Sequence, residues 1–310
     1  MRKLRFKKIL TNKKNILIIK HGALGDIIES EGLMRAIRNH HLESKITFLT
    51  SSRDKSLIEC FYYIDEVMTD DRSTFWNVSK NFLLLKELIN CKFDIVYDLQ
   101  NSQRTSIYKK FFLIKPQWIT TNRKTHPISG LMGLVEMLEK HGVSDKKSYI
   151  PDISWMASDV SQLLKDNNIK SRFILFIPGS SASHKNKRWP YFKGLSEELI
   201  NKGFDVVSIL GPDEMILEDS LYGKIFKNLS WGDLVGVINN ATVVIGNDTG
   251  PSHIASCLGK RGIALFGPTT ALQSGLSRPP FTVIEADDLS KITIKKGMKK
   301  LLLQLDSIKN

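Results

Sequence analysis

The residues Asn247-Asp248-Thr249-Gly250 stand between a run of β-branched residues and the start of a predicted helix. The preceding run, Val243-Val244-Ile245, is typical of a buried strand, Gly250 frees the turn, and Pro251 suits the first helical position. The unpaired N–H groups and the positive dipole end of such a helix favour a phosphate. The junction therefore predicts an anion site, with an ordinary helix N-cap as the alternative interpretation.

Three further turns with polar or charged residues also follow predicted strands, at residues 21–26, 179–190 and 211–214. In an open parallel sheet the carboxyl ends of the strands lie along one edge, where ligands bind. The first turn reads G-x-x-G-D, and neither G-x-G-x-x-G nor G-x-x-x-x-G-K-[ST] occurs in the chain. This disfavours a nicotinamide oxidoreductase and a P-loop NTPase. We therefore expect one ligand site built from several turns, without a cofactor.

Metal chemistry is also disfavoured by the spacing of the acidic residues and cysteines. No two aspartates stand two residues apart, so the Asp-x-Asp metal clamp of many sugar-nucleotide enzymes is missing. Lys, Arg and helix dipoles would then meet the charge of a diphosphate in place of Mg²⁺. Cys60, Cys91 and Cys257 form no CxxC pair, and we interpret them as reduced core residues. We expect no bound metal.

The elements that position these turns alternate between strands and helices. In the first half, strands are predicted at 15–20, 46–50, 66–68, 94–99 and 118–121, with helices at 26–40, 53–62, 74–90, 101–113 and 127–141. In the second half, strands are predicted at 172–177, 205–210, 242–245, 262–266 and 281–285, with helices at 190–201, 213–227, 231–240 and 292–305. The alternation predicts an α/β protein with parallel sheets covered on both faces.

The length of 310 residues suits two domains of about 150 residues each. A polar, proline-bearing stretch at 148–152 marks the boundary. We therefore predict a basic tail at 1–14, an N-terminal Rossmann-like domain at 15–150 and a C-terminal Rossmann-like domain at 151–310. Two such halves would place a ligand cleft between them, at the carboxyl ends of their strands.

Composition and charge narrow the class of protein further. No apolar run reaches the roughly 18 residues that cross a bilayer, and the N-terminus lacks a signal-peptide pattern, so we expect a cytoplasmic protein. Seven of the thirteen net positive charges precede residue 15 and alternate with apolar side chains. That pattern favours contact with an anionic membrane surface, with a solvated, disordered tail as the alternative. Nucleic acid is not an expected partner, because no dedicated reader motif accompanies the charge.

A set of motifs in order along the chain makes a family resemblance specific. The motifs are Gly22-Ala23-Leu24-Gly25-Asp26, Pro178-Gly179-Ser180-Ser181, Lys187-Arg188-Trp189-Pro190, Gly211-Pro212-Asp213-Glu214, Asn247 to His253, and Leu265-Phe266-Gly267-Pro268-Thr269. From about residue 15 to residue 270 the chain resembles the bacterial lipopolysaccharide heptosyltransferases, glycosyltransferase family 9.

The resemblance implies a GT-B fold and metal-independent transfer with inversion at the anomeric carbon. It also implies an ADP-heptose donor and a lipid-linked inner-core saccharide acceptor at the inner face of the inner membrane. In that fold the closing helix commonly crosses back onto the first domain.

Position by position, the resemblance makes Asp26 the catalytic base, with a helix N-cap as the alternative. Lys187 matches the lysine that neutralises the departing diphosphate, with Lys185 and Arg188 as nearby rivals and a solvated loop lysine as the alternative. Three serines are expected to donate hydrogen bonds to the same oxygens: Ser180, Ser181 and Ser183.

The remaining donor residues lie in two later turns. Glu214 matches an acid that holds the donor ribose, although an acid in a first helical turn is also stabilising by itself. We expect Asp248 to bind sugar hydroxyls or to orient Lys187, while the N–H groups of Thr249 and Gly250 meet the phosphate. His253 either contacts the donor or packs inside its helix.

The acceptor is less well determined by these patterns. Residues 27–32 and Thr270 depart from the usual family pattern beside the expected cleft. Arg53, Arg104 and Arg123 are candidates for binding an acidic acceptor, with ordinary surface charge as the alternative. Two further readings stay open. One is the same fold and mechanism with another nucleotide-sugar or glycan, and the other is a catalytically silent protein that binds glycolipid or nucleotide.

Overall fold

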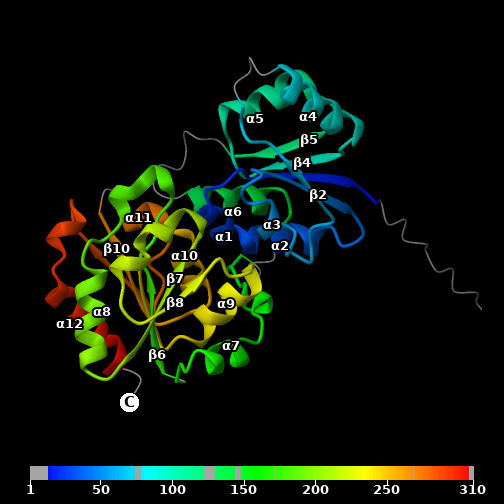
Figure 1. The fold of residues 1–310 in the computed structure, drawn as a ribbon. Helices are drawn as coiled ribbons and strands as arrows, with labels where there is room; N and C mark the ends of the chain where they lie inside the picture. The colour runs from blue at the N-terminus through cyan, green and yellow to red at the C-terminus, as the bar shows by residue number, and fades with distance from the viewer. Residues whose placement is uncertain are drawn as a thin grey trace, which may run out of the picture. The chain divides into compact units, whose positions relative to one another are not determined.

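The computed structural model describes residues 13–73, 78–121, 130–143, 147, 149–170, 172–267 and 269–306. These residues divide into two compact units. The first unit contains the described residues of 1–22, 33–123 and 134–149, and the second contains those of 23–32, 124–133 and 150–310. Each unit holds one parallel sheet (Figure 1), as the alternation of strands and helices predicts.

The sheet of the first unit has parallel strands in the order β3-β2-β1-β4-β5. The central strand β1 is buried along nearly its whole length because its sequence is Asn-Ile-Leu-Ile-Ile. The strand order reverses between β1 and β4, so their carboxyl ends form the switch point where α/β sheets bind ligands. The strands are β1 (Asn15–Ile19), β2 (Lys45–Thr50), β3 (Glu66–Thr69), β4 (Ile95–Asp98) and β5 (Gln117–Thr120).

Helices connect these strands, and one of them continues as a π-helix. Ser102 caps the start of α5 by accepting a hydrogen bond from the Thr105 N–H at 3.1 Å. Figure 1 shows α4 and α5 side by side, and α4 and the π-helix that continues α5 contribute Leu88 and Tyr108 to an apolar cluster with Leu17 of β1. The helices are α2 (Glu31–His40), α3 (Lys55–Ile58), α4 (Val78–Asn90), α5 (Gln103–Ile107), the π-helix η1 (Tyr108–Phe112) and α6 (Gly130–Lys140).

The sheet of the second unit is also parallel, in the order β11-β10-β9-β6-β7-β8. Its strand order reverses between β6 and β9, and both strands are buried at every residue. The turns that carry the motifs at 178–181 and 247–250 therefore leave the sheet at its switch point. The strands are β6 (Phe173–Ile177), β7 (Asp205–Leu210), β8 (Lys224–Lys227), β9 (Val243–Asn247), β10 (Gly262–Phe266) and β11 (Phe281–Glu285).

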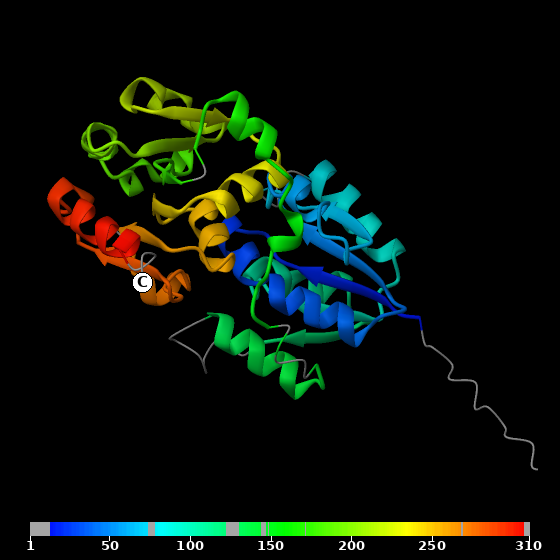
Figure 2. The same ribbon diagram turned by 90° about the horizontal axis from the view of Figure 1, so that it is seen from below.

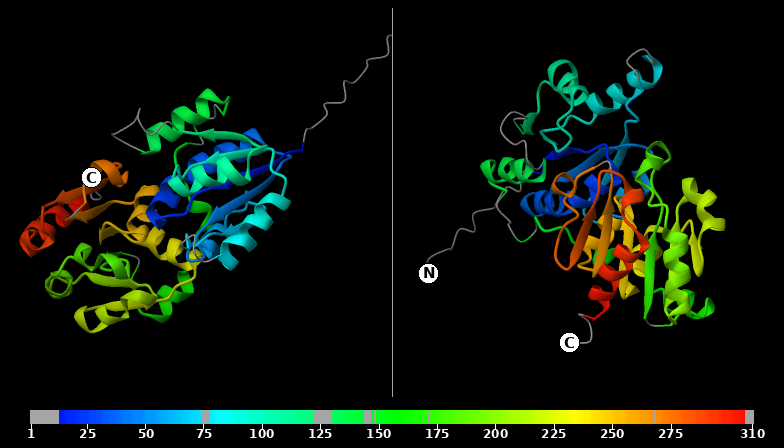
Figure 3. Two further views of the ribbon diagram at one scale, coloured as in Figure 1. Left: turned by 90° about the horizontal axis from the view of Figure 1, so that it is seen from above. Right: turned by 90° about the vertical axis from the view of Figure 1, so that its left-hand side faces the viewer.

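The helices of the second unit lie on both faces of its sheet. Figure 3 shows α8 and α12 side by side on one face, and Figure 2 shows α1 beside α10. The α-helices are α1 (Leu24–Glu29), α7 (Ser161–Asp166), α8 (Phe192–Asn201), α9 (Trp231–Asn240), α10 (Gly250–Cys257), α11 (Ala271–Ser274) and α12 (Ile294–Asp306). The 3-10 helices are η2 (Ser154–Met156), η3 (Ala182–Lys187), η4 (Pro212–Ser220) and η5 (Leu289–Lys291).

The closing helix α12 packs on the sheet of its own unit. Its Met298 and Leu301 are buried in the same apolar cluster as Trp189 and Ile292. The indole of Trp189 is 3% exposed, and its N–H donates to the Ile292 carbonyl at 2.7 Å. The described residues of α12 belong to the second unit, and the crossing of this helix onto the first domain stays a prediction.

Residues 23–32 form another difference from the linear division at residue 150. They contain α1, which follows β1 of the first unit directly in sequence but packs with α10 in the second unit. The expected helix at 26–40 is two helices that break at Ser30, whose N–H and hydroxyl both bond to the Asp26 carbonyl. A serine hydroxyl that bonds back to the preceding turn competes with the regular helical pattern.

The expected helix at 213–227 is also wrong in its second half. The 3-10 helix η4 ends at Ser220, and Lys224–Lys227 is the edge strand β8, paired with β7. Gly223 adopts a φ of 96°, which favours glycine, and redirects the chain between them. Cys60 is a further correction, because its side chain is exposed and not part of the core.

Candidate active site

Helices α1 and α10 pack closely because each offers a glycine to the other. A Cβ atom built on Gly25 would lie 2.6 Å from the His253 ring, and one built on Gly250 would overlap the Leu24 side chain. Both approaches are closer than packed side chains permit. The two glycines therefore bring the start of α1 against the start of α10 (Figure 2).

Asn247 joins the two turns at the switch point of the second sheet. Its side-chain amide donates to the carbonyls of Pro178 and Gly179 at 2.8 and 3.1 Å, and its Oδ1 accepts from the Trp189 N–H at 3.1 Å. Asn247 is fully buried. It therefore fixes the 178–179 turn and the start of the Trp189 segment against the end of β9. The sequence motifs alone give this side chain no role, although its position at the end of a buried strand is a usable signal.

Asp248, in the turn between β9 and α10, forms an ion pair with Lys187 at the end of η3. The Lys187 Nζ lies 2.6 Å from the Asp248 Oδ2, and the Thr269 hydroxyl donates to the same oxygen at 2.8 Å. Burial alone would raise the pKa of the Asp248 carboxyl, but His253, Lys187 and Thr269 lower it well below its ordinary value. Asp248 is thus an anion at neutral pH that orients the Lys187 ammonium.

After Asp248 the backbone enters α10, and the first N–H groups of a helix have no acceptor within the helix. Thr249 is the N-cap residue, and Pro251 lies in the first turn, where its missing N–H is not needed. Among the described residues the Thr249 hydroxyl is buried without a hydrogen-bond partner. The start of α10 therefore places N–H groups and a hydroxyl beside the Lys187 ammonium, and all of them suit an anion.

His253 and Glu29 connect α10 to α1 through a buried contact. The His253 Nδ1 lies 2.9 Å from the Glu29 Oε1, and the His253 Nε2 lies 3.7 Å from the Asp248 Oδ1. The Arg278 guanidinium pairs with the other oxygen of Glu29. Burial alone would lower the pKa of His253, but the Asp248 and Glu29 carboxylates raise it above its ordinary value.

Glu29 lies within residues 27–32, which depart from the family pattern. From the sequence we related this departure to acceptor binding. The structure instead buries Glu29 and binds it to α10 and to Arg278. Glu29 and Arg278 are functional candidates that our sequence reasoning missed. The acidic departure at residue 29 was the visible signal.

Asp26 lies on the first turn of α1 and combines two features. Its side chain is exposed, and its Oδ2 accepts a hydrogen bond from the Ala23 N–H at 3.1 Å. Ala23 is the N-cap residue of α1, so the alternative that Asp26 is itself the N-cap is wrong; Asp26 is the third helical residue, and its side chain bonds back to the N-cap N–H. This bond leaves the carboxylate accessible and able to accept a proton from a bound hydroxyl.

The three serines of the 180–183 turn differ in their partners. Ser180 is buried, and its Oγ accepts from the Arg188 Nε at 3.0 Å, while its carbonyl accepts from the Arg188 Nη2 at 3.1 Å. Arg188 is thereby tied to the turn. Ser181 and Ser183 are more accessible, and each hydroxyl lies 2.9 Å from the His184 Nδ1. The turn thus places Ser181 and Ser183 at the surface and uses Ser180 internally.

Glu214 lies in the first turn of η4 and contacts two glycines. Its Oε2 accepts from the Gly211 N–H at 2.8 Å. A Cβ atom on Gly179 would overlap the Glu214 carboxyl group, so the carboxyl group lies against the 178–181 turn. This geometry stabilises the start of η4 and brings Glu214 beside the carboxyl end of β6.

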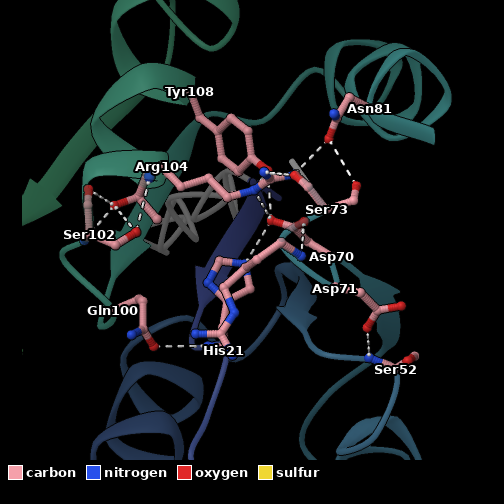
Figure 4. Close-up of polar contacts among 12 residues, drawn as sticks. His21, Ser52, Asp70, Asp71, Ser73, Asn81, Gln100, Ser102, Arg104 and Tyr108 are labelled. Carbon is pink, nitrogen blue, oxygen red and sulfur yellow. Dashed lines mark hydrogen bonds and ion pairs between the residues drawn. The ribbon is translucent and has the colours of Figure 1, made fainter. Parts of the chain in front are cut away.

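The first unit also has a buried carboxylate at the carboxyl edge of its sheet, that of Asp70 (Figure 4). Asp70 follows β3, and its Oδ2 accepts from the Arg104 Nε at 2.7 Å and the Tyr108 hydroxyl at 2.6 Å. The His21 Nε2 lies 3.0 Å from the same oxygen. Burial alone would raise the pKa of the Asp70 carboxyl, but His21, Arg104 and Tyr108 lower it well below its ordinary value.

Arg104 makes its remaining bonds within the same unit. Its Nη1 donates to the Ser73 carbonyl at 2.8 Å, and its Nη2 donates to the Asn81 Oδ1 at 2.8 Å. All three guanidinium nitrogens are therefore held by protein groups (Figure 4). We assign Arg104 to the packing of α4 and α5, which removes it from our acceptor proposal.

The other predicted features divide between described and undescribed residues. Arg53 is exposed in the turn before α3. Arg123 and residues 1–12 of the basic tail lie outside the described residues. Within the described part of the chain, His, Cys, Asp and Glu form no group of three that could hold a metal ion. No helix among the described residues is long and apolar enough to span a membrane.

Comparisons with known proteins agree with this geometry. The family model described as glycosyltransferase family 9 (heptosyltransferase) matches residues 135–300. The chain is 23% identical over 329 residues to lipopolysaccharide heptosyltransferase 1 of Campylobacter coli, and the alignment covers 92% of each chain.

Solved structures show the same fold. A glycosyltransferase family 9 protein from Veillonella parvula has a TM-score of 0.76 at 21% identity, with 95% of this chain and 97% of that chain covered. The ADP-heptose lipopolysaccharide heptosyltransferase II of E. coli has a TM-score of 0.73 at 18% identity, with 96% and 100% covered. The two parallel-sheet α/β units therefore form a GT-B fold.

Proposed function

The chain belongs to glycosyltransferase family 9, the heptosyltransferases, and from this premise we propose that it transfers heptose from ADP-heptose to a lipopolysaccharide inner-core acceptor. The relative from Campylobacter coli is named a lipopolysaccharide heptosyltransferase, and the E. coli structure is named for ADP-heptose. The acceptor we propose is a lipid-linked saccharide that bears Kdo or heptose.

The observation that carries the donor assignment is the Lys187–Asp248 pair at the start of α10. A diphosphate placed there would meet the Lys187 ammonium and the N–H groups of Thr249 and Gly250. Asp248 would repel a phosphate, and for that reason we assign it to the orientation of Lys187. Ser181 and Ser183 supply further hydroxyl donors, and Glu214 is positioned to accept from ribose hydroxyls.

The reaction we propose is a single displacement at the anomeric carbon. An acceptor hydroxyl oxygen bonds to that carbon while the bond between the carbon and the ADP oxygen breaks, so the configuration inverts. The proton of the hydroxyl moves to the exposed Asp26 carboxylate. Lys187 and the start of α10 stabilise the negative charge that develops on the ADP oxygen, in the role that a metal ion has in other enzymes.

Packing supports the assignment of the catalytic base to Asp26 and of phosphate binding to the start of α10. Asp26 stands on α1, and α1 is held to α10 by Gly25, Gly250 and the Glu29–His253 contact. The base and the phosphate-binding turn therefore belong to one rigid pair of helices. Fixed geometry of this kind contributes to catalysis because the reacting groups need not be ordered during the reaction.

The experiment is to incubate the purified protein with ADP-heptose and Kdo-bearing lipid A in EDTA and to measure ADP release. We expect turnover in EDTA and a product of inverted anomeric configuration by NMR. Asp26→Asn retains the hydrogen bond to Ala23 and should lower turnover by about 10²-fold or more while ADP binding is retained. Absence of turnover with every ADP-sugar would contradict the donor assignment.

The identity of the nucleotide is tested separately by thermal shift with ADP, UDP and GDP. A ligand at 100 times its dissociation constant stabilises the folded state by about 2.7 kcal/mol. We expect the largest shift with ADP. A larger shift with UDP or GDP would retain the fold and the mechanism but change the donor. Binding of ADP with no turnover on any acceptor would favour a catalytically silent binding protein.

We also propose that the protein works at the inner face of the inner membrane, because a lipid-linked acceptor is confined to a membrane. The basic tail at 1–14 is one candidate for peripheral contact, since its cations alternate with apolar side chains.

A further inference from the structure

A short segment of the first unit exposes apolar side chains beside exposed lysines. Phe111 is 58% exposed and Ile114 is 72% exposed. Lys109, Lys110 and Lys115 are exposed around them. We call this region the KF surface, and it consists of Lys109, Lys110, Phe111, Ile114, Lys115 and Trp118.

Local structure explains why these side chains point outward. The segment is the π-helix η1 followed by a short link to β5. Phe112, Leu113 and Trp118 pack against the apolar cluster of the first unit, and the indole Nε1–H of Trp118 donates to the Leu113 carbonyl at 2.8 Å. Because these residues hold the backbone, Phe111 and Ile114 are presented on a fixed frame. π-helical turns occur frequently at functional sites.

The KF surface surrounds an open depression of about 520 Å³. The Lys109 Nζ lies 6.0 Å from the Trp118 ring centre, and the Lys110 Nζ lies 5.0 Å from the Phe111 ring centre. Each ammonium thus stays close to an apolar ring. The depression is lined by Ser106, Lys109, Lys110, Ile114, Pro116 and Trp118.

The charged residues in the stretch of chain that carries this surface have one sign. Residues 99–135 include no Asp or Glu, so no acid of this stretch neutralises the three lysines. Arg104, the cation of the same stretch that is bound internally, pairs with Asp70. Lysines beside exposed aromatic and aliphatic side chains are the composition of segments that lie on anionic membranes.

We propose that the KF surface docks the protein on an anionic lipid bilayer. Phe111 and Ile114 enter the headgroup region, and Lys109, Lys110 and Lys115 contact lipid phosphates. The choice of a membrane as the partner rests on the lipid-linked acceptor of the proposed function. The docking site then lies on the described part of the first unit and is separate from the basic tail at 1–14.

The test is co-sedimentation of the full chain with phosphatidylcholine vesicles, with and without phosphatidylglycerol, in the absence of any sugar nucleotide. We expect binding only with phosphatidylglycerol, and weaker binding as salt increases. Replacing the three lysines by glutamine should reduce binding on the order of 100-fold, because each lysine near an anionic surface contributes about fivefold. Phe111→Ser with Ile114→Ser should reduce it roughly tenfold or more.

The matched control is Phe82→Ser with Leu83→Ser on α4, which removes similarly exposed apolar area outside the acid-free stretch. We expect that control to bind vesicles like the wild type. Equal losses from both pairs would overturn the proposal. So would full retention by the KF variants together with loss when the tail cations are changed to glutamine, or equal binding of a short DNA duplex through the same lysines.

Activity on a delipidated, soluble acceptor separates this proposal from the proposed function. The KF variants should retain wild-type turnover on that acceptor and lose turnover on vesicle-embedded acceptor. Parallel losses on both acceptors would indicate damage to the fold and contradict a docking role. Vesicle binding itself needs no donor, so it can succeed or fail independently of the transferase assignment.

Discussion

Asp70 in the first unit and Asp248 in the second unit are two versions of one arrangement. Each follows a strand at the carboxyl edge of a parallel sheet, lies beside a buried histidine and binds one cation. The pKa of each carboxyl group is lowered well below its ordinary value, because these partners outweigh the effect of burial. The place of each aspartate after a strand and the direction of its pKa shift therefore do not tell which of the two serves ligand binding.

The two ion pairs differ in how many protein groups hold the cation. Every guanidinium nitrogen of Arg104 is bonded within the first unit, to Asp70, Ser73 and Asn81. Among the residues that the structure describes, Lys187 donates one hydrogen bond, at 2.6 Å to Asp248, and an ammonium group has three donors. Each nitrogen of Arg104 is therefore tied to a protein group of its own unit, whereas Lys187 is oriented by Asp248 and its ammonium group has further donors for a ligand. A buried ion pair indicates chemistry only where its cation has capacity left.

The largest expected effect is on stability, from Arg104→Met. The substitution leaves the Asp70 carboxylate buried without its cation, which typically costs about 3–5 kcal/mol. Urea unfolding of the full chain measures this loss. The control is Arg53→Met, at an exposed position, which should change stability by less than about 0.5 kcal/mol. If Arg104→Met lowered turnover at unchanged stability, Arg104 would belong to the site and the contrast would fail.

The second expected effect is on catalysis, from Lys187→Ala. Removing a group that stabilises developing charge lowers turnover by about 10² to 10³-fold. The free energy of unfolding should also fall, but by less than in Arg104→Met, because the Asp248 side chain is 10% exposed and that of Asp70 is 1% exposed. Steady-state kinetics and urea unfolding of the same preparation give both quantities. Lys185→Ala is the matched control on the same helix η3 and should retain activity. Similar losses in the two variants would refute a specific role for Lys187.

The third effect concerns the link between α1 and α10, through Glu29→Gln. The substitution retains the size of the side chain but removes a charge that holds His253 and Arg278. We expect turnover to fall roughly tenfold, because the helix that carries Asp26 is less well fixed, with ADP affinity nearly unchanged. A loss of ADP affinity with unchanged turnover would instead place Glu29 in donor binding. Glu29→Asp should restore part of the turnover.

The smallest effect is a pH dependence of stability. The pKa of His253 is raised above 6.5 in the folded protein, so its stabilisation is complete below about pH 6.5 and is lost as pH rises through the folded value. Asp70 and Asp248 act in the opposite direction: their contribution is present above about pH 3.8 and is lost as pH falls. Urea unfolding at a series of pH values should show the alkaline loss in the wild type and a weaker one in His253→Asn. An identical alkaline loss in both proteins would contradict the assignment.

Much of the fold follows from local patterns in the chain. Buried runs such as Asn-Ile-Leu-Ile-Ile at β1 predict their strands directly, and the turns after the strands were predicted at the correct edges. The misplaced elements are those with weak local patterns. The edge strand β8 is four residues long with lysine at both ends, and the break at Ser30 depends on one hydroxyl.

By itself, the sequence determined the α/β class and the family, and it located the turns to which we assign chemistry, because these depend on short-range patterns of residue type. Only the tertiary structure decided which charges meet. Lys187 and Asp248 are 61 residues apart, Arg104 and Asp70 are 34 apart, and Glu29 and His253 are 224 apart. Pairs at such separations depend on strand order and on the glycine contacts between α1 and α10. Packing is therefore what distinguishes Arg104, which we assign to structure, from Lys187, which we propose for ligand binding.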